Sequence, residues 1–320
     1  MSDLWYIILL LVGFPILIYG AELLVNSASS LAKRQNVPNI VIGLTIVAFG
    51  TSSPELVVNV SASIQNNSDI VLGNILGSNI VNIFMILGIS AIIFPLSIKP
   101  NTIKFEIPLC LLAAFVVLFA ANDIFLDQQA ESVISRIDGI MMLLFFAIFL
   151  IYNIQLMKSS SFTEDIVVKN YSIPLSSLLI LGGITLLCVG GQLIVFSAIK
   201  VATYFQIPER IIALTIISIG TSLPELTTSV VAARKKNVDI AVGNIVGSNI
   251  FNIFFILGIS AVIHPVKINA SSNLDLLVNV LSSLLLLVFV FTGKDRKIDK
   301  WEGLIFVLLY CLYLIFMLLN

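Results

Sequence analysis

Long apolar stretches separated by short polar segments run through this chain from end to end. Each stretch holds about 18 or more mostly apolar residues, enough for an α-helix to cross roughly 30 Å of hydrocarbon. The apolar residues are continuous rather than alternating, so a transmembrane β-barrel is not expected. The predicted spans are residues 4–25, 38–64, 70–94, 104–121, 137–157, 174–199, 208–233, 239–264, 274–292 and 301–319.

The composition agrees with this pattern. Hydrophobic residues make up 58% of the chain and charged residues 11%, whereas about a quarter of a soluble domain is charged. We therefore predict an all-α protein with ten transmembrane helices in the lipid bilayer of a cell membrane. No phosphate-binding glycine loop or soluble domain is evident, so we expect no enzymatic activity, cofactor, ATP-driven pumping or nucleic-acid binding. We also expect no obligatory protein partner, and a monomer is compatible with the sequence.

The basic residues are distributed unevenly. Loops after odd-numbered spans hold 13 of the 17 lysines and arginines, and all other segments hold 4. Because cytoplasmic loops carry an excess of basic residues, the odd loops are predicted to be cytoplasmic and both termini extracytoplasmic. No cleavage site follows the first span, which we expect to be retained. The three cysteines are scattered within spans and indicate neither disulfides nor a thiolate metal site.

The two halves of the chain are related in sequence. GTSSPEL at 50–56 recurs as GTSLPEL at 220–226, and residues 69–95 match 239–265 at 20 of 27 positions. Each half holds five spans, an odd number, so the second half enters the bilayer from the opposite side. This predicts an inverted-topology repeat, an architecture common among secondary transporters. The predicted units are a first repeat at 1–157, a cytoplasmic linker at 158–173 and a second repeat at 174–320.

The GTSxPE segments place oxygen atoms together within the membrane. Helical spacing puts Thr51, Ser52 and Glu55 within one turn, and Pro54 crowds the carbonyl of Gly50, which predicts a kinked or broken helix. A carboxylate in hydrocarbon costs roughly 2.5–3.5 kcal/mol, so two matched glutamates indicate a cation site rather than two accidental burials. The second copy consists of Thr221, Ser222, Pro224 and Glu225.

The third and eighth spans add further polar pairs. Ser78 and Asn82 lie one helical turn apart, and Ser248 and Asn252 repeat this spacing; we predict that all four coordinate ions. The glycines of these spans are expected to serve close helix packing. Four more asparagines either line the site or cap broken helix ends, and the sequence favours neither role: Asn74, Asn79, Asn244 and Asn249.

Charge and ligand type narrow the substrate. Two glutamates neutralise one Ca²⁺, and amide and hydroxyl oxygens can complete the six to eight ligands that Ca²⁺ takes. Several Na⁺ ions could share the same oxygens, which is a natural basis for exchange, whereas Mg²⁺ demands stricter geometry. Proton/Ca²⁺ antiport is the nearest alternative because desolvated glutamates can bind protons. A cation channel is a further alternative, and a non-transporting scaffold would not explain the paired acids.

Three other features lead to predictions of their own. Glu22 is matched by the uncharged Gln192, so an interfacial helix-end role is preferred over a helper role in gating. His264 ends the eighth span as an interfacial polar residue. The acidic segment 122–136 is read as a solvated external loop, with enrichment of local cations as the alternative.

The duplicated GTSxPE and GNxxGSNxxN motifs closely resemble those of the cation/Ca²⁺ exchanger superfamily, specifically its prokaryotic sodium/calcium exchangers. The resemblance implies a core of spans 2, 3, 7 and 8, across which spans 1 and 6 slide during alternating access. It also implies that Glu55 and Glu225 bind both Ca²⁺ and Na⁺. The other implied ligands are Thr51, Ser52, Thr221 and Ser222 through hydroxyl or backbone oxygens, Ser78 and Ser248 at flanking Na⁺ positions, and the carbonyls of Ala48 and Ser218.

Two departures from the family pattern matter. Relatives usually have a small apolar residue where this chain has Ser218. Some relatives, including potassium-dependent exchangers, carry aspartate where this chain has Asn252, so the amide argues against K⁺ dependence. The family implies about three Na⁺ per Ca²⁺, which would make the exchange electrogenic.

Overall fold

The computed structural model describes residues 2–126, 131–159, 169–205, 218–269, 272–292 and 296–319. The label η marks a π-helical segment. The helices of the first half are α1 (Ser2–Arg34), α2 (Asn39–Ile42), η1 (Gly43–Val47), α3 (Ala48–Thr51), α4 (Ser53–Ile64), α5 (Ser68–Ile80), η2 (Val81–Leu87), α6 (Gly88–Ile93), η3 (Thr102–Glu106), α7 (Ile107–Ala120), α8 (Asp123–Leu126) and α9 (Arg136–Ser159).

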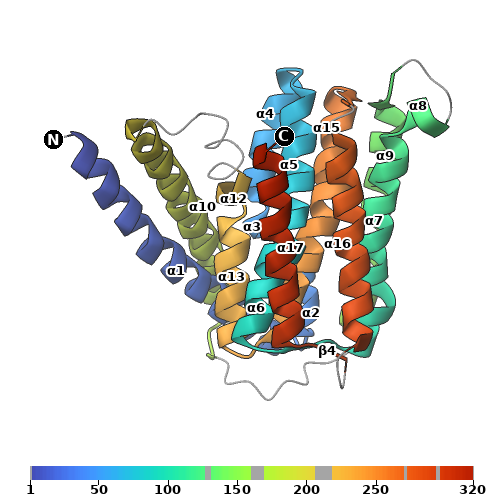
Figure 1. The fold of residues 1–320 in the computed structure, drawn as a ribbon. Helices are drawn as coiled ribbons and strands as arrows, with labels where there is room; N and C mark the ends of the chain where they lie inside the picture. The colour runs from blue at the N-terminus through green and yellow to red at the C-terminus, as the bar shows by residue number, and fades with distance from the viewer. Residues whose placement is uncertain are drawn as a thin grey trace.

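The described residues of the second half are also mainly helical. Its helices are α10 (Ile173–Tyr204), α12 (Ser218–Thr221), α13 (Leu223–Arg234), α14 (Val238–Ile250), η5 (Phe251–Leu257), α15 (Gly258–Ile263), α16 (Ser272–Thr292) and α17 (Lys300–Leu319). Figure 1 shows them as a bundle, with α1 and α10 leaning away from the rest at one side.

The predicted membrane spans are largely present as helices. Within the described ranges, eight helices are long and apolar enough to cross a membrane, and the bent pair Asn39–Thr51 and Ser53–Ile64 makes a ninth. The predicted span 208–233 begins outside the described residues, and its remainder forms α12 and α13. The all-helical membrane class is therefore confirmed, and the count of ten remains a prediction.

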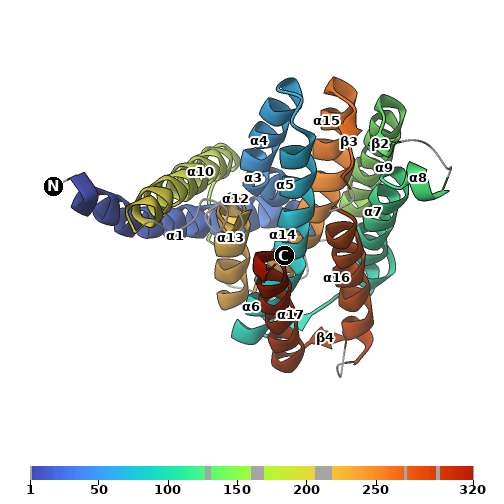
Figure 2. The same cartoon turned by 45° about the horizontal axis from the view of Figure 1, so that its top comes forward.

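The third and eighth spans form the centre of the bundle. In their most apolar stretches, Ser68–Ile93 is 78% buried and Val238–Ile263 is 83% buried, against 22% to 39% for the other continuous spans. Figure 2 shows α5 and α14 with the other helices around them. Spans buried to this extent can hold polar residues away from lipid, and it is in the protein interior that polar residues of membrane helices are tolerated.

Two short antiparallel sheets close the ends of the bundle. β1 (Leu96–Ser97) pairs with β4 (Lys297–Ile298), and β2 (Val133–Ile134) pairs with β3 (Val266–Lys267). Each sheet therefore joins a strand after the third span of one half to a strand before the last span of the other half. In Figure 1, β4 lies at the lower end, whereas α15, which leads into β3, ends at the upper end.

Glycine allows close helix contact at several of the positions expected from the sequence. Gly73 is an exception, because an added Cβ there would meet nothing within 4 Å and packing does not require a glycine. A Cβ atom on Gly247 would lie 2.8 Å from the carbonyl oxygen of Leu44, so α14 could not approach η1 this closely with any other residue. Gly20 and Gly183 provide the same close approach between α1 and α10, where an added Cβ would lie 2.9–3.0 Å from backbone atoms of the partner helix. Packing is thus the role of these glycines.

Candidate cation site

The second span breaks at Ser52, as the proline predicts. Ser52 leaves the helix (φ −81°, ψ 7°), and α4 then continues at 49° to the preceding segment. Pro54 lies in the first turn of α4, where a missing N–H group leaves no bond unmade. Ser222 (φ −88°, ψ 7°) separates α12 from α13 in the same way, with Pro224 in the following turn. Both copies of the motif therefore interrupt their helices at the serine.

Each glutamate accepts a hydrogen bond from the serine of the other half. The Ser52 hydroxyl donates to Glu225 Oε1 at 2.9 Å, and the Ser222 hydroxyl donates to Glu55 Oε1 at 3.4 Å. Ser78 of α5 donates to the same Glu55 oxygen at 3.4 Å. Both glutamates are only 1% exposed. Helices that are 170 residues apart in sequence thus bring two carboxylates into one buried polar centre.

Each carboxylate keeps one oxygen that has no hydrogen-bond partner among the described residues. These oxygens, Glu55 Oε2 and Glu225 Oε2, are accompanied by three more unpartnered buried oxygens at sequence-predicted positions: Asn82 Oδ1, Asn252 Oδ1 and Ser248 Oγ. Buried polar atoms are rarely left without a partner, and an unpaired buried charge is costly. Other unpartnered buried atoms occur elsewhere in the protein, but these five oxygens all belong to the duplicated motifs, and such a set is chemically suited to a hard cation.

The threonines of the motif contact asparagines of the other half. The Thr51 hydroxyl lies 3.0 Å from Asn244 Oδ1, and the Thr221 hydroxyl lies 3.4 Å from Asn74 Oδ1. Asn244 also donates to the backbone carbonyl of Glu225 at 3.4 Å. Asn74 and Asn244, whose roles the sequence leaves open, therefore support the segments beside the helix breaks.

The structure places nearly all predicted ligand residues in the protein interior. Ten of them are at most 2% exposed, and these are Ala48, Thr51, Ser52, Glu55, Ser78, Asn82, Ser222, Glu225, Ser248 and Asn252. Thr221 is half-buried. For Ser218 the structure describes the backbone alone. The Ala48 carbonyl accepts from the Ser52 N–H at 3.0 Å and lies 3.3 Å from the Thr51 hydroxyl, so protein donors already occupy it in this conformation.

Two π-helical segments at the centre are absent from the sequence predictions. η2 contains Asn82 and η5 contains Asn252, and both segments begin one residue after the end of a regular helix. π-Helical turns are rare and occur frequently at functional sites. The identical GSNI in both halves directly before these segments is the one sequence signal that could have indicated them.

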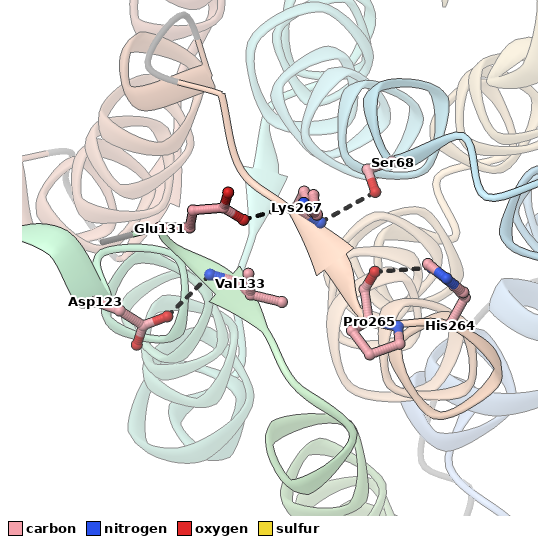
Figure 3. A network of polar contacts seen from close by, with 7 residues as sticks. All are labelled: Ser68, Asp123, Glu131, Val133, His264, Pro265 and Lys267. Atoms are coloured by element: carbon pink, nitrogen blue, oxygen red, sulfur yellow. Dashed lines mark hydrogen bonds and ion pairs between the residues drawn. The ribbon is translucent and has the colours of Figure 1, made fainter. Parts of the chain in front are cut away.

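The acidic segment near the second sheet makes structural contacts. Figure 3 shows Asp123 accepting from the backbone N–H of Val133 at 2.9 Å and Glu131 paired with Lys267 at 3.0 Å. The Lys267 N–H also donates to the hydroxyl of Ser68 at 3.0 Å. These contacts connect the strand ends to α5 and α8, although Glu131 and Lys267 are well exposed. The remaining acid of the segment, at position 127, lies outside the described residues.

His264 lies at a helix end, as the sequence suggests, whereas Glu22 lies well inside α1 (Ser2–Arg34) and is not a helix-end residue, because α1 continues beyond the predicted span. His264 is half-buried at the end of α15, with Nδ1 3.0 Å from the carbonyl oxygen of Pro265 (Figure 3). Glu22 is exposed on α1, one turn before Asn26, which accepts from Lys235 Nζ at 2.6 Å. Burial lowers the pKa of Lys235, and the negative charge of Glu22 opposes that shift. The contact between α1 and the end of α13 is thus made by Asn26 and Lys235, with Glu22 nearby.

The centre uses few strongly coordinating side chains. Across the described parts of the chain, no group of three or more His, Cys, Asp or Glu residues gathers in one place. Two carboxylates surrounded by neutral oxygens suit alkali and alkaline-earth cations, whereas sites for zinc or copper use imidazole and thiolate ligands. These features define a multi-pass membrane protein built around a buried, oxygen-rich centre.

Comparison with known proteins identifies the family. Residues 5–155 and 175–319 match the family described as sodium/calcium exchanger protein. The chain is 36% identical to inner membrane protein YrbG of Escherichia coli over 87% of each chain. It is 34% identical to sodium/calcium exchanger MaX1 of Methanosarcina acetivorans, over 96% of this chain and 97% of that protein.

The fold matches that of a solved exchanger. A structure of the sodium-calcium exchanger NCX_Mj, soaked with Na⁺ and Sr²⁺, superposes with a TM-score of 0.83 at 33% identity, over 97% of this chain and 98% of the other. The chain therefore belongs to the sodium/calcium exchanger family. It is a membrane antiporter of the cation/Ca²⁺ exchanger type and not an enzyme.

Proposed function

We propose that this protein exchanges Na⁺ for Ca²⁺ at a single centre built around Glu55 and Glu225. The observation that carries the proposal is the crossed pair of serine–glutamate hydrogen bonds, which holds two carboxylates together and leaves one oxygen of each unpartnered. The names of MaX1 and NCX_Mj, both sodium/calcium exchangers, support the same choice of ions.

Charge balance explains why the two ions would compete. Two ionised glutamates balance one Ca²⁺, and the unpartnered oxygens of Asn82, Asn252 and Ser248 supply neutral ligands toward the six to eight that Ca²⁺ requires. Na⁺ ions would use the same carboxylates, so both substrates cannot be bound at full occupancy together. If more than two Na⁺ replace one Ca²⁺, each cycle moves net charge. We propose electrogenic exchange on the basis of the Na⁺/Ca²⁺ ratio that the family resemblance implies.

The outer helices support an alternating-access mechanism. α1 has 33 residues and α10 has 32, which at 1.5 Å per residue gives about 50 Å for each. Helices this long exceed a hydrocarbon core of roughly 30 Å, and tilting is one way to accommodate the excess. Figures 1 and 2 show both helices side by side and inclined to the bundle. We propose that this pair moves across the central helices to expose the centre to each side in turn.

The inverted repeat and membrane orientation complete the proposal. The strand pairs β1–β4 and β2–β3 join equivalent parts of the two halves at opposite ends of the bundle, which supports inversion. Both termini lie at the upper end in Figure 1, as an even number of spans requires. The excess of basic residues in the odd loops assigns that end to the extracytoplasmic side.

Proton/Ca²⁺ antiport is a second candidate, because the unpartnered Oε2 atom of each glutamate could bind a proton instead of Na⁺. Gradient-driven ⁴⁵Ca²⁺ uptake into proteoliposomes separates the two, with Na⁺, H⁺ and K⁺ gradients imposed one at a time. An outward-directed Na⁺ gradient, with Na⁺ higher inside the vesicles, should drive Ca²⁺ uptake in the absence of K⁺. Uptake driven by a pH gradient and indifferent to Na⁺ would refute the proposal.

A further inference from the structure

Four asparagines link the two halves directly beside the centre. Asn79 is the penultimate residue of α5 and Asn249 is the penultimate residue of α14, and both are completely buried. Asn82 and Asn252 follow three residues later, within η2 and η5. Sequence reasoning assigns ion ligation to Asn82 and Asn252 only.

The hydrogen bonds among these residues form a reciprocal network. Asn82 Nδ2 donates to Asn249 Oδ1 at 2.9 Å, and Asn252 Nδ2 donates to Asn79 Oδ1 at 2.9 Å. Asn79 Nδ2 donates to the backbone carbonyl of Asn249 at 3.4 Å, and Asn249 Nδ2 donates to the backbone carbonyl of Asn79 at 3.3 Å. Every bond in the network crosses from one half of the chain to the other.

This network fixes the orientation of the side-chain amides of Asn82 and Asn252. An amide side chain carries an oxygen acceptor at one position and an NH₂ donor at the other. Since Asn249 and Asn79 accept from the NH₂ groups of Asn82 and Asn252, the oxygens of those two residues take the remaining positions. Both oxygens are buried without a partner among the described residues. Turned by 180°, either amide would present N–H groups in place of a ligand oxygen.

We propose that Asn79 and Asn249 are positioning residues for cation binding, which fix the amides of Asn82 and Asn252 so that their oxygens are available to the transported ion. The inference deepens the proposed function by assigning the orientation of two ligands. It concerns cation affinity and holds whether Na⁺ or H⁺ is the coupling ion.

Asn249→Leu is the first test, because leucine has a similar size and cannot accept from Asn82. Equilibrium binding of ⁴⁵Ca²⁺ to the purified protein should weaken about tenfold, the factor that corresponds to about 1.4 kcal/mol. Asn153→Leu is the matched control. Asn153 is 2% exposed in α9 and donates to the carbonyl of Phe149 within its own helix, so this variant should bind Ca²⁺ like the unmodified protein.

A second background separates positioning from a general structural effect. In Asn82→Asp the side chain ends in two oxygens, so it offers the ion an oxygen in either orientation, and it no longer donates to Asn249 Oδ1. Adding Asn249→Leu to this background should change Ca²⁺ affinity by less than about twofold, although the same substitution costs about tenfold when Asn82 is present. A similar loss in both backgrounds, or no loss in either, would overturn the proposal. Because binding is measured without a gradient, failure of Na⁺-driven transport would leave this test intact.

Discussion

Glu225→Gln changes the centre with little disturbance of its packing. Glutamine keeps the shape and retains an oxygen that can accept from Ser52, whose hydroxyl lies 2.9 Å from Glu225 Oε1. It replaces Oε2, which has no partner among the described residues, with an NH₂ group. The substitution therefore breaks no observed hydrogen bond, and it removes one negative charge and one candidate ligand oxygen.

The expected loss follows from that charge. With one glutamate remaining, a bound Ca²⁺ leaves about one positive charge unbalanced inside the membrane. A single charge there costs roughly 2.5–3.5 kcal/mol, which corresponds to a loss of Ca²⁺ affinity of roughly 10²-fold. Without cations, the variant should be no less stable than the unmodified protein, because it no longer buries an unpaired carboxylate oxygen.

Thermal unfolding of the purified protein over a Ca²⁺ titration measures both effects. The unmodified protein should gain stability as Ca²⁺ rises, since a ligand that binds only the folded state stabilises it. Glu225→Gln should start at an equal or higher melting temperature and show no gain at the same concentrations. Glu106→Gln is the control: this carboxyl is completely buried but accepts from Tyr152 at 2.6 Å, in the contact between η3 and α9. Stabilisation of Glu225→Gln by Ca²⁺ at unchanged affinity would refute the assignment.

Three further outcomes are expected. Alanine substitutions of the four hydroxyl residues should weaken Na⁺ activation of Ca²⁺ uptake more than they weaken Ca²⁺ affinity; these residues are Thr51, Thr221, Ser78 and Ser248. Unchanged Na⁺ activation in every variant would exclude them as Na⁺ ligands. Gly247→Ala should destabilise the protein by about 1–3 kcal/mol, because the added Cβ meets the Leu44 carbonyl at 2.8 Å. Gly182→Ala, whose Cβ would meet only a Leu23 methyl at 3.7 Å, should not; equal stabilities in thermal unfolding would contradict the packing argument. Ca²⁺ uptake by the unmodified protein should be insensitive to K⁺ and should respond to an imposed membrane potential; K⁺ stimulation would count against the reading of Asn252.

The sequence was most informative at residues whose placement in a membrane helix is energetically unfavourable. Glu55 and Glu225 are expensive in hydrocarbon, and Pro54 and Pro224 disfavour an unbroken helix through the preceding turn, so the buried acids and the helix breaks could both be predicted. Duplication of the motif indicated that the two acids act together. These inferences needed only local spacing and the match between halves.

Contacts between the halves could not be derived in the same way. Sequence spacing shows that Ser52 and Glu55 share a helical turn, but the Ser52 hydroxyl bonds to Glu225, because the break at Ser52 redirects α4. The roles of Asn79 and Asn249 depend on how α5 and α14 meet, and the π-helical turns after them depend on tertiary packing. No periodicity in one sequence specifies such pairings.

The central claim is that Glu55 and Glu225 together hold one divalent cation. Anomalous diffraction from crystals soaked in Sr²⁺, as a stand-in for Ca²⁺, locates that ion directly. One peak within about 2.3–2.7 Å of oxygens from both glutamates is expected, close to the distances that Ca²⁺ keeps to its ligands. A peak that contacts only one of the two acids, or that lies outside this centre, would contradict the account.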